Sequence, residues 1–271
     1  MPEFIAPDAG IIGLPEGLKE EGKRVDFKPD DFALLIETKG YRLAWSRTAQ
    51  CPCVGINDQT DQSDPNCSLC EGAGWLRFQP IGAVTNSFIV GELDALQTKI
   101  VGTDSAVIRA IMTAFVTTPT PWDKVGPRLQ GTVNVTTRAE NKIGYYDRLV
   151  NLDSTIVYSE LFKASGTSLD TTRYLVREIN LLRSATQVYA EGTNFNIVAG
   201  DIQWVAGHEP EEDTQLVAHY LCHPTWRIIE HPHAIRLSPV KFKTAKPTTP
   251  QGDPKNLPNQ GVAQYEWLPL P

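Results

Sequence analysis

Four of the five cysteines lie within twenty residues of one another, and this cluster constrains the fold more than any other sequence feature. Cys51 and Cys53 form a C-x-C pair, and Cys67 and Cys70 form a C-x-x-C pair thirteen residues further on. Four thiolates at such a spacing suit a structural Zn²⁺, whose tetrahedral shell leaves no position open for a substrate. The pattern predicts that Cys51, Cys53, Cys67 and Cys70 bind zinc. The polar loop between the two pairs should then depend on the metal for its shape.

Two local disulfides or four buried free thiols are the alternative interpretations of this cluster. No basic region followed by an apolar stretch occurs in residues 1–10, so no export signal is read, and metal binding is favoured over disulfides. A serine at Cys70 should therefore release the metal. A serine at the isolated Cys222 should have little effect.

The composition describes a core-forming protein and excludes several function classes. Of 271 residues, 41% are hydrophobic, which excludes disorder along the whole length. The formal net charge of −7 argues against nucleic-acid binding as the main activity, because the chain has no net positive field to attract phosphates. No window approaches the roughly 18 apolar residues of a membrane span, so no membrane association is expected.

Short elements bounded by turns predict a mainly-β fold of small barrel or sandwich domains. A helix is expected at Phe32–Glu37, ending at Gly40, and the alternation over Tyr41–Arg47 predicts a strand. The fold class is thus mainly β, with one short N-terminal helix and a zinc-stabilised loop. Further strands are expected at Trp75–Phe78, Ser87–Val90, Lys99–Gly102, Ile108–Thr117, Gly131–Thr137, Tyr174–Ile179, Gln187–Tyr189, Phe195–Val198, Ile202–Val205, Leu216–Leu221 and Trp226–Glu230.

Shifts in composition predict five segments along the chain. The segments are an extended N-terminal arm (1–30), a helix and strand with the zinc knuckle (31–80), a first β-rich barrel-like domain (81–147), a second β-rich domain (148–240) and an extended C-terminal tail (241–271). The tail ends in an aromatic stretch, Tyr265–Pro271, which either docks on a partner or packs against the protein's own core.

A second metal site is a weaker hypothesis, built on Cys222, His223, His231 and His233. The period of two places Cys222 and His223 on opposite faces of a strand, which argues against joint ligation. A buried cysteine with surface histidines is the favoured interpretation.

No catalytic motif is found, and the protein is expected not to be an enzyme. The chain has no G-x-S-x-G elbow and no H-E-x-x-H pair. Glu209, Glu211, Glu212 and Asp213 cluster in an evident turn, where a solvated acidic loop is favoured over a catalytic carboxylate pair.

The second cysteine turn, Cys67–Gly74, reads C-x-x-C-x-G-x-G and resembles the zinc knuckle of DnaJ-type chaperones. The glycines of such a knuckle turn backbone amides toward the sulfurs. The resemblance covers this one turn, and the other half of the cluster is C-x-C, so chaperone function does not follow from it.

A broader resemblance covers residues 31–240. The order of Tyr41–Arg47, Cys51-Pro52-Cys53 and Asp64–Trp75 resembles the neck proteins (head-to-tail connectors or tail-completion proteins) of tailed bacteriophages. Gly131–Thr136, followed by Tyr146-Asp147-Arg148-Leu149, resembles the barrel segment of such proteins. Tyr189–Trp204 is similar to a hairpin of phage structural proteins, with Asn194 where aspartate is usual.

This resemblance implies a structural virion protein, assembled in the host cytoplasm, that forms a homo-oligomeric ring of six or twelve copies between head and tail. Its partners would be further copies of itself, a portal or adaptor protein above, and a tail-terminator or sheath-proximal protein below. DNA would pass through the lumen without sequence-specific binding, to which a net negative chain is suited. Edge strands and both chain ends are the expected contacts. The alternatives are another phage structural part, such as a baseplate or fibre-attachment protein, and a zinc-containing cell-wall hydrolase.

Overall fold

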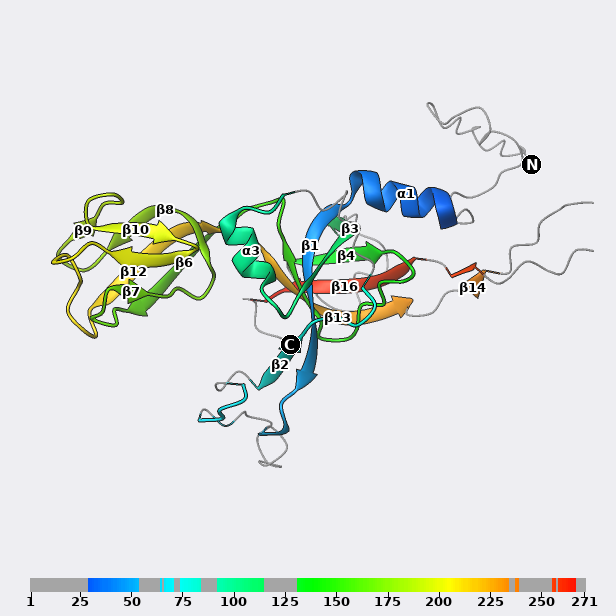
Figure 1. Cartoon of the computed structure of the whole chain (residues 1–271), viewed down its shortest axis with the longest axis horizontal. Helices are drawn as coiled ribbons and strands as arrows, with labels where there is room; N and C mark the ends of the chain where they lie inside the picture. Colours follow the sequence, from blue (N-terminus) through cyan, green and yellow to red (C-terminus); the bar gives the residue numbers. More distant parts are fainter. Residues whose placement is uncertain are drawn as a thin grey trace, which may run out of the picture.

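The computed structural model describes residues 29–53, 64, 66–70, 74–83, 92–114, 131–233, 237–238, 255–256 and 258–266. The described residues form a β-barrel, a second β domain beside it, and a hairpin that projects from the barrel (Figure 1). The predicted mainly-β fold of barrel and sandwich domains is confirmed. Among the described helices, none has the length and apolar character needed to cross a membrane.

Six antiparallel strands close the barrel, because the last of them, β5 (Arg148–Asn151), pairs with the first, β1 (Tyr41–Gln50). One further strand, β2 (Trp75–Phe78), extends β1 beyond the barrel wall, and the short pair β14 (Leu237–Ser238) and β15 (Lys255–Asn256) lies outside it. The barrel strands, in spatial order, are β1 (Tyr41–Gln50), β3 (Ala106–Ala114), β4 (Thr132–Thr137), β16 (Asn259–Tyr265), β13 (Thr225–His233) and β5 (Arg148–Asn151).

The middle of strand β1 is buried on both faces, because apolar side chains pack against it from either side. Leu43 and Trp45 belong to the apolar core inside the barrel. Ala44, which points the other way, packs in a second cluster with Val107 of β3 and Ile100 of the helix α3 (Ala95–Val101). Helix α3 therefore covers the outer side of β1, while the barrel core covers its inner side (Figure 1).

The predicted N-terminal helix is present as α1 (Pro29–Lys39). Ile36 is fully buried, and the amide of Gly40 donates to the Ile36 carbonyl at 2.8 Å, where the helix ends. Arg138 forms an ion pair with Glu37. The helix is thus attached to the barrel at its C-terminal turn.

The second domain occupies the chain between β5 and β13 and consists of two facing sheets. Buried aromatic and aliphatic side chains from both sheets make one core, in which the rings of Tyr189 and Phe195 both contact Trp204. The strands are β6 (Ile156–Lys163), β12 (Gln215–Cys222), β8 (Val176–Arg183) and β9 (Val188–Tyr189) in one sheet, and β10 (Phe195–Val198), β11 (Asp201–Trp204) and β7 (Leu169–Asp170) in the other.

Helix α3 also joins the two domains through Asp94, which pairs with Arg177, and Lys99, which pairs with Asp201. Gly200, at φ 88°, allows a close approach, since a Cβ atom there would lie 2.6 Å from Leu96 of α3. The junction therefore combines ion pairs with tight packing.

The strand expected at Lys99–Gly102 is wrong, because these residues form the end of helix α3. Asp94 caps the helix by accepting from the amide of Gln97, whose side chain returns a hydrogen bond to the Asp94 amide. Gly102 follows the last helical residue at φ 49°. These local signals override an apolar run that is too short to specify a strand.

The expected division of the chain is also corrected. The boundary at 147/148 separates β4 from β5, yet both belong to one barrel. The expected extended tail, 241–271, contributes the barrel strand β16, whose pairing on both sides buries its backbone. The expected arm over residues 1–28, the strand at 87–90 and the residues 115–117 lie outside the described residues.

A buried carboxylate fixes the loop before β5 against β1. The Trp45 indole Nε1 donates to Oδ2 of Asp147 at 2.8 Å, the Arg47 guanidinium lies 3.1 Å from the same oxygen, and the Gly144 amide donates to it. Asp147 is 1% exposed, so water cannot replace these donors.

We expect Asp147→Asn to lower the free energy of unfolding by about 1–3 kcal/mol. The asparagine NH₂ group would replace one carboxylate oxygen, so that at this buried site an N–H donor would face N–H donors of the protein. Urea unfolding measures the change. Asp213→Asn is the matched control, since Asp213 is exposed and asparagine tolerates its φ of 64°. Equal losses in the two variants would contradict the role given to Asp147.

Candidate metal centre

The hairpin of β1 and β2 brings the two cysteine pairs together at its end. The ladder runs from Arg47 opposite Phe78 to Gln50 opposite Trp75, so the next residues, Cys51 and Gly74, are neighbours. The Cys51 amide donates to the Gly74 carbonyl at 2.8 Å. The cysteine cluster therefore lies at the tip of the projecting hairpin, away from the barrel (Figure 1).

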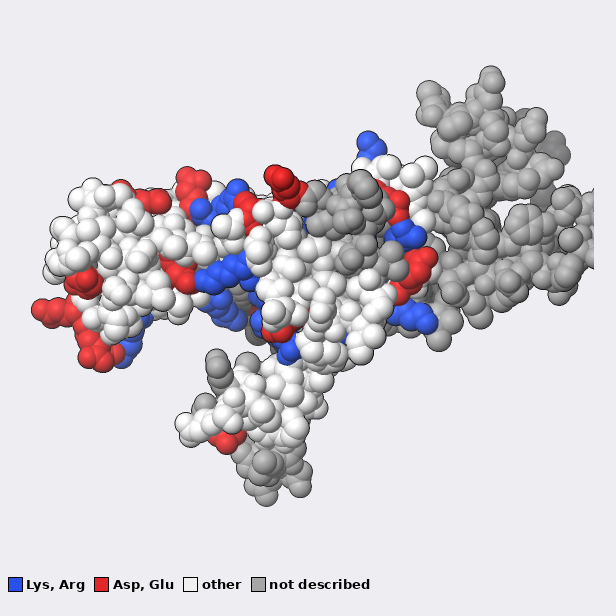
Figure 2. All heavy atoms as spheres, in the orientation of Figure 1, with Lys and Arg blue, Asp and Glu red and all other residues white. Residues whose placement is uncertain are grey.

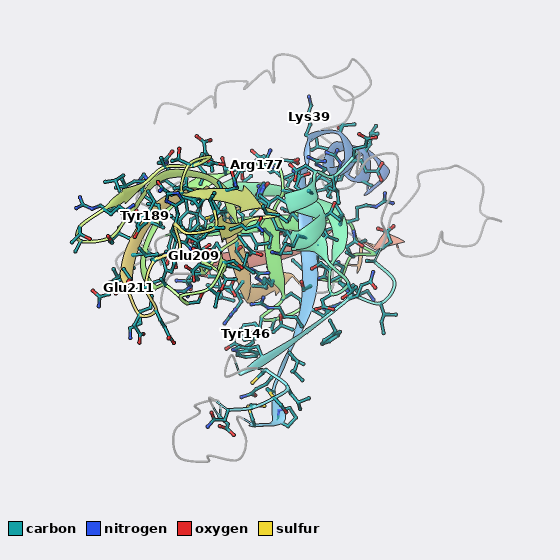
Figure 3. The ribbon with its side chains drawn as sticks, turned by 60° about the vertical axis from the view of Figure 1, so that its left-hand side comes forward. Lys39, Tyr146, Arg177, Tyr189, Glu209 and Glu211 are labelled. Atoms are coloured by element: carbon teal, nitrogen blue, oxygen red, sulfur yellow. The ribbon has the colours of Figure 1, made fainter. Side chains whose placement is uncertain are left out.

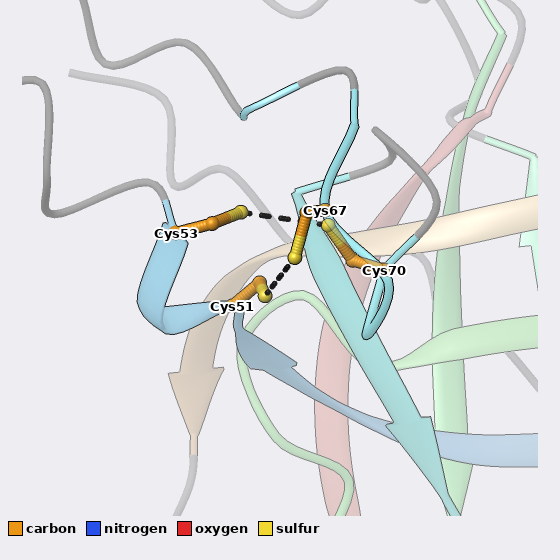
Figure 4. A group of neighbouring side chains, drawn as sticks. All are labelled: Cys51, Cys53, Cys67 and Cys70. Atoms are coloured by element: carbon orange, nitrogen blue, oxygen red, sulfur yellow. Dashed lines mark hydrogen bonds between the residues drawn. The ribbon is translucent and has the colours of Figure 1, made fainter.

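The four sulfur atoms converge, as the sequence predicted. All four lie within 4.8 Å of one another (Figure 4). Cys51 Sγ is 3.7 Å from Cys67 Sγ, and Cys53 Sγ is 3.5 Å from Cys70 Sγ. Each close contact joins one residue of the C-x-C pair to one of the C-x-x-C pair, so the two turns pack against one another through their sulfur atoms.

These distances fit a single tetrahedral metal ion. Four sulfurs at about 2.3 Å from a central ion are about 3.8 Å apart, close to the separations observed. A disulfide requires about 2.05 Å, and all four cysteines are free thiols. The four cysteines can therefore bind a metal ion, and four sulfurs would complete its shell without any other ligand.

The protein environment of the sulfurs prepares part of the cluster for ligation. The amides of Cys70 and Leu69 donate toward Cys67 and lower its pKa to about 7. Burial raises the pKa of Cys53 to about 12 in the absence of a metal. Gly74, at φ 75°, directs its amide to Cys70 Sγ at 3.3 Å, which is the sulfur contact expected of a knuckle glycine.

Aromatic and cationic side chains hold the hairpin base against the barrel. The ring of Trp75 lies 4.6 Å from that of Tyr146, which is seen beside the hairpin in Figure 3, and Arg227 of β13 lies over Trp75 at 5.6 Å. The tip is thus connected to the barrel through packed side chains as well as through its own backbone.

A carboxylate that sequence reasoning missed lies beside this base. Glu266, directly after β16, contacts the guanidinium groups of Arg77 at 3.2 Å, Arg148 at 3.0 Å and Arg227 at 3.1 Å. Burial raises the pKa of Glu266, but the three arginines outweigh this effect and hold it below its ordinary value. No sequence signal identified Glu266, because its partners come from three separated strands.

Of the four residues in the weaker second-site hypothesis, Cys222 and His223 have described side chains, and neither belongs to a metal-holding group among the described residues. Cys222 is fully buried in the core of the second domain, as expected, and His223 is also buried, which corrects its assignment to the surface. The side chains of His231 and His233, on β13, lie outside the described residues. Among the described residues, Cys51, Cys53, Cys67 and Cys70 are the group able to hold a metal.

The acidic cluster lies in the turn between β11 and β12, as predicted. Glu209, Glu211 and their neighbours are on the second domain, far from the cysteine hairpin (Figure 3). Glu209 accepts from the Gly207 amide at 2.7 Å, and Asp213 pairs with Lys163 at 2.8 Å. These carboxylates have local partners in a solvated turn.

Comparison with known proteins gives no relative: no protein-family model matches the chain, and no curated protein matches it.

We expect Cys70→Ser to lose the metal, because a neutral hydroxyl replaces one of four thiolate ligands. Native mass spectrometry measures metal per chain. The control is a substitution at Cys222, which lies outside the cluster. Because Cys222 is buried, alanine is used there in place of serine. Cys222→Ala should lower the free energy of unfolding by about 1 kcal/mol and keep the metal. Full metal content in Cys70→Ser would contradict the site.

We expect Glu266→Gln to destabilise the protein by about 2–4 kcal/mol near pH 7, because three arginines lose their shared partner. The folded pKa of Glu266 lies below its unfolded value near 4.5, so its contribution is complete above that pH and is lost as pH falls through the folded pKa. Urea unfolding at several pH values should show the difference from wild type shrinking below about pH 4.5. For the exposed control Glu211→Gln the difference should stay small throughout.

Proposed function

We propose that this protein is a structural virion component of a tailed bacteriophage, a ring-forming neck subunit that joins the portal end of the head to the tail. In this proposal it has no catalytic activity, and Cys51, Cys53, Cys67 and Cys70 hold a structural Zn²⁺. DNA passes through the lumen of the ring, and the assembled protein resides in the virion.

The observation that carries the proposal is the projecting hairpin with a cysteine cluster at its tip. A projection outside the core of its own chain can reach a neighbouring copy, as the heterologous contacts of a ring require. The strings that resemble phage neck proteins, Cys51-Pro52-Cys53 and Asp64–Trp75, are the ones that build this projection.

The chemistry of the tip supports zinc in a structural role. A set of four sulfur ligands favours Zn²⁺ over hard cations, which prefer oxygen. Four protein ligands close the tetrahedral shell, so substrate has no free coordination position. The ion would replace an apolar core in a hairpin tip whose described buried cluster consists mainly of the cysteines and Leu76.

An exposed apolar sheet face offers the contact that a ring subunit requires. On the outer face of β6, Leu161 is 62% exposed, and its ladder partner Val217 on β12 is 40% exposed. Val157 and Leu181 are exposed on the same sheet. In the proposed ring this face packs against a neighbouring copy.

Native mass spectrometry of the purified protein tests the proposal, because it reports the metal and the number of chains together. The expected result is a closed ring of six or twelve copies with one zinc per chain. Monomers that stay monomeric with added portal protein would contradict the ring, and a sulfur site without zinc would contradict the structural role.

The sheet face is tested separately with Leu161→Lys, which should shift rings to monomers because it places a charge in an apolar contact. Val198→Lys is the matched control, since Val198 is 49% exposed on the facing sheet of the same domain. Rings that persist in Leu161→Lys, or that dissociate in both variants, would contradict this assignment.

A further inference from the structure

A cavity lies where the barrel, helix α3 and the second domain meet. Its volume is about 250 Å³, and its lining includes Arg77 of β2, Lys99 of α3, Arg148 of β5 and Arg173 of the second domain. Figure 2 shows Lys and Arg side chains gathered where the two domains join. No acidic side chain is among the described residues that line this cavity.

Positive charge exceeds negative charge around the cavity. Arg77 and Arg148 share Glu266 with Arg227, so three guanidinium groups face one carboxylate. Lys99 pairs with Asp201. Burial, and then the nearby Arg148, lower the pKa of Arg77 to about 10, although Glu266 and Asp104 oppose this change. With this pKa Arg77 remains charged at neutral pH. The cationic side chains around the cavity together favour a bound anion.

Arg173 adds a further guanidinium to the lining of the cavity. It is exposed, its guanidinium carbon lies 5.7 Å from the centre of the Tyr174 ring, and it also has a side-chain hydrogen bond with Tyr158. The N–H donors at its rim are the groups that recognise oxyanions. The carboxylate of Glu160 is occupied with the backbone amide of Arg173.

The lining also contains a buried acceptor, the imidazole of His223. Its Nδ1 lies 3.0 Å from the Asn151 carbonyl and 2.9 Å from the Ser154 carbonyl, so Nδ1 carries the proton. Burial lowers the pKa of His223, which leaves the ring neutral at neutral pH. Nε2 is then an acceptor, and it is buried without a hydrogen-bond partner in the described part of the chain.

We propose that this cavity binds a protonated phosphate group, as hydrogen phosphate or the monoanion of a phosphate monoester. The arginines and Lys99 donate to the phosphate oxygens, and the P–OH group donates to His223 Nε2. Sulfate has similar size and charge but no proton to donate, and an internal DNA phosphodiester also lacks one. The site does not depend on ring assembly, so it can fail or succeed independently of the proposed neck function.

Isothermal titration calorimetry with inorganic phosphate, at constant ionic strength and pH 7, tests the site on the full-length protein. Arg173→Gln should weaken binding about tenfold, as the loss of a charged hydrogen bond predicts. Arg183→Gln is the matched control, since Arg183 is an exposed arginine of the same domain that does not line the cavity. Glu266→Gln should act in the opposite direction and tighten binding, because it leaves three arginines without their carboxylate.

Competing ligands identify the form of the phosphate. A nucleoside monophosphate that displaces inorganic phosphate assigns the site to monoesters, and failure to displace assigns it to the free ion; both results support the site. Sulfate that binds as tightly as phosphate overturns the proposal, as does a DNA duplex that displaces phosphate from wild type. Absence of saturable phosphate binding, or equal binding by wild type and Arg173→Gln, also overturns it.

Discussion

Closure of the barrel is the constraint on which the rest of the structure depends. Strand β16 pairs with β4 on one side and β13 on the other, so the barrel lacks a wall until residues near 260 are in place. Without β16, both neighbours would present unpaired backbone groups at open edges. The second domain is inserted in the chain between β5 and β13. Because these two strands pair with one another, the two ends of the domain lie side by side at the barrel wall. Most contacts in such a topology join residues distant in sequence, which is typical of slow folding.

In both domains the same interaction holds a loop against a strand: a buried aspartate accepts a hydrogen bond from a tryptophan indole. In the barrel the pair is Asp147 and Trp45, and in the second domain Asp170 accepts from Trp204 Nε1 at 2.7 Å. Asp170 also accepts from the Ser165 amide at 2.7 Å. A large apolar ring fills the core while its single N–H has a charged acceptor, so neither group is buried without a partner. In each domain one interaction thus contributes both to core packing and to the position of a loop.

The sequence predicted the features that depend on neighbouring residues and missed those that depend on distant ones. Helix α1, strand β1, the β10–β11 hairpin and the convergence of four cysteines follow from local patterns. The start of helix α3 could also be predicted, since Asp94 and Gln97 form a capping box, but the apolar run at the end of the helix favoured a strand. Strand β16 carries polar residues and a glycine, and it is buried by pairing on both sides and by packing of Ala263 in the barrel core. The role of Glu266 likewise requires three strands that sequence alone cannot bring together.

Strand β2 connects the cysteine cluster to the cavity. Its first residue, Trp75, follows Gly74, whose amide contacts Cys70 Sγ, and its third residue, Arg77, contacts Glu266 and lines the cavity. Alternate residues share a face of a strand, so both side chains lie on the side packed against Tyr146 and Arg227. The ladder with β1 fixes this strand over four residue pairs. A displacement of the tip by a bound neighbour would have to break this ladder or carry Arg77 with it. One short strand thus joins the cysteine tip to a residue that lines the cavity.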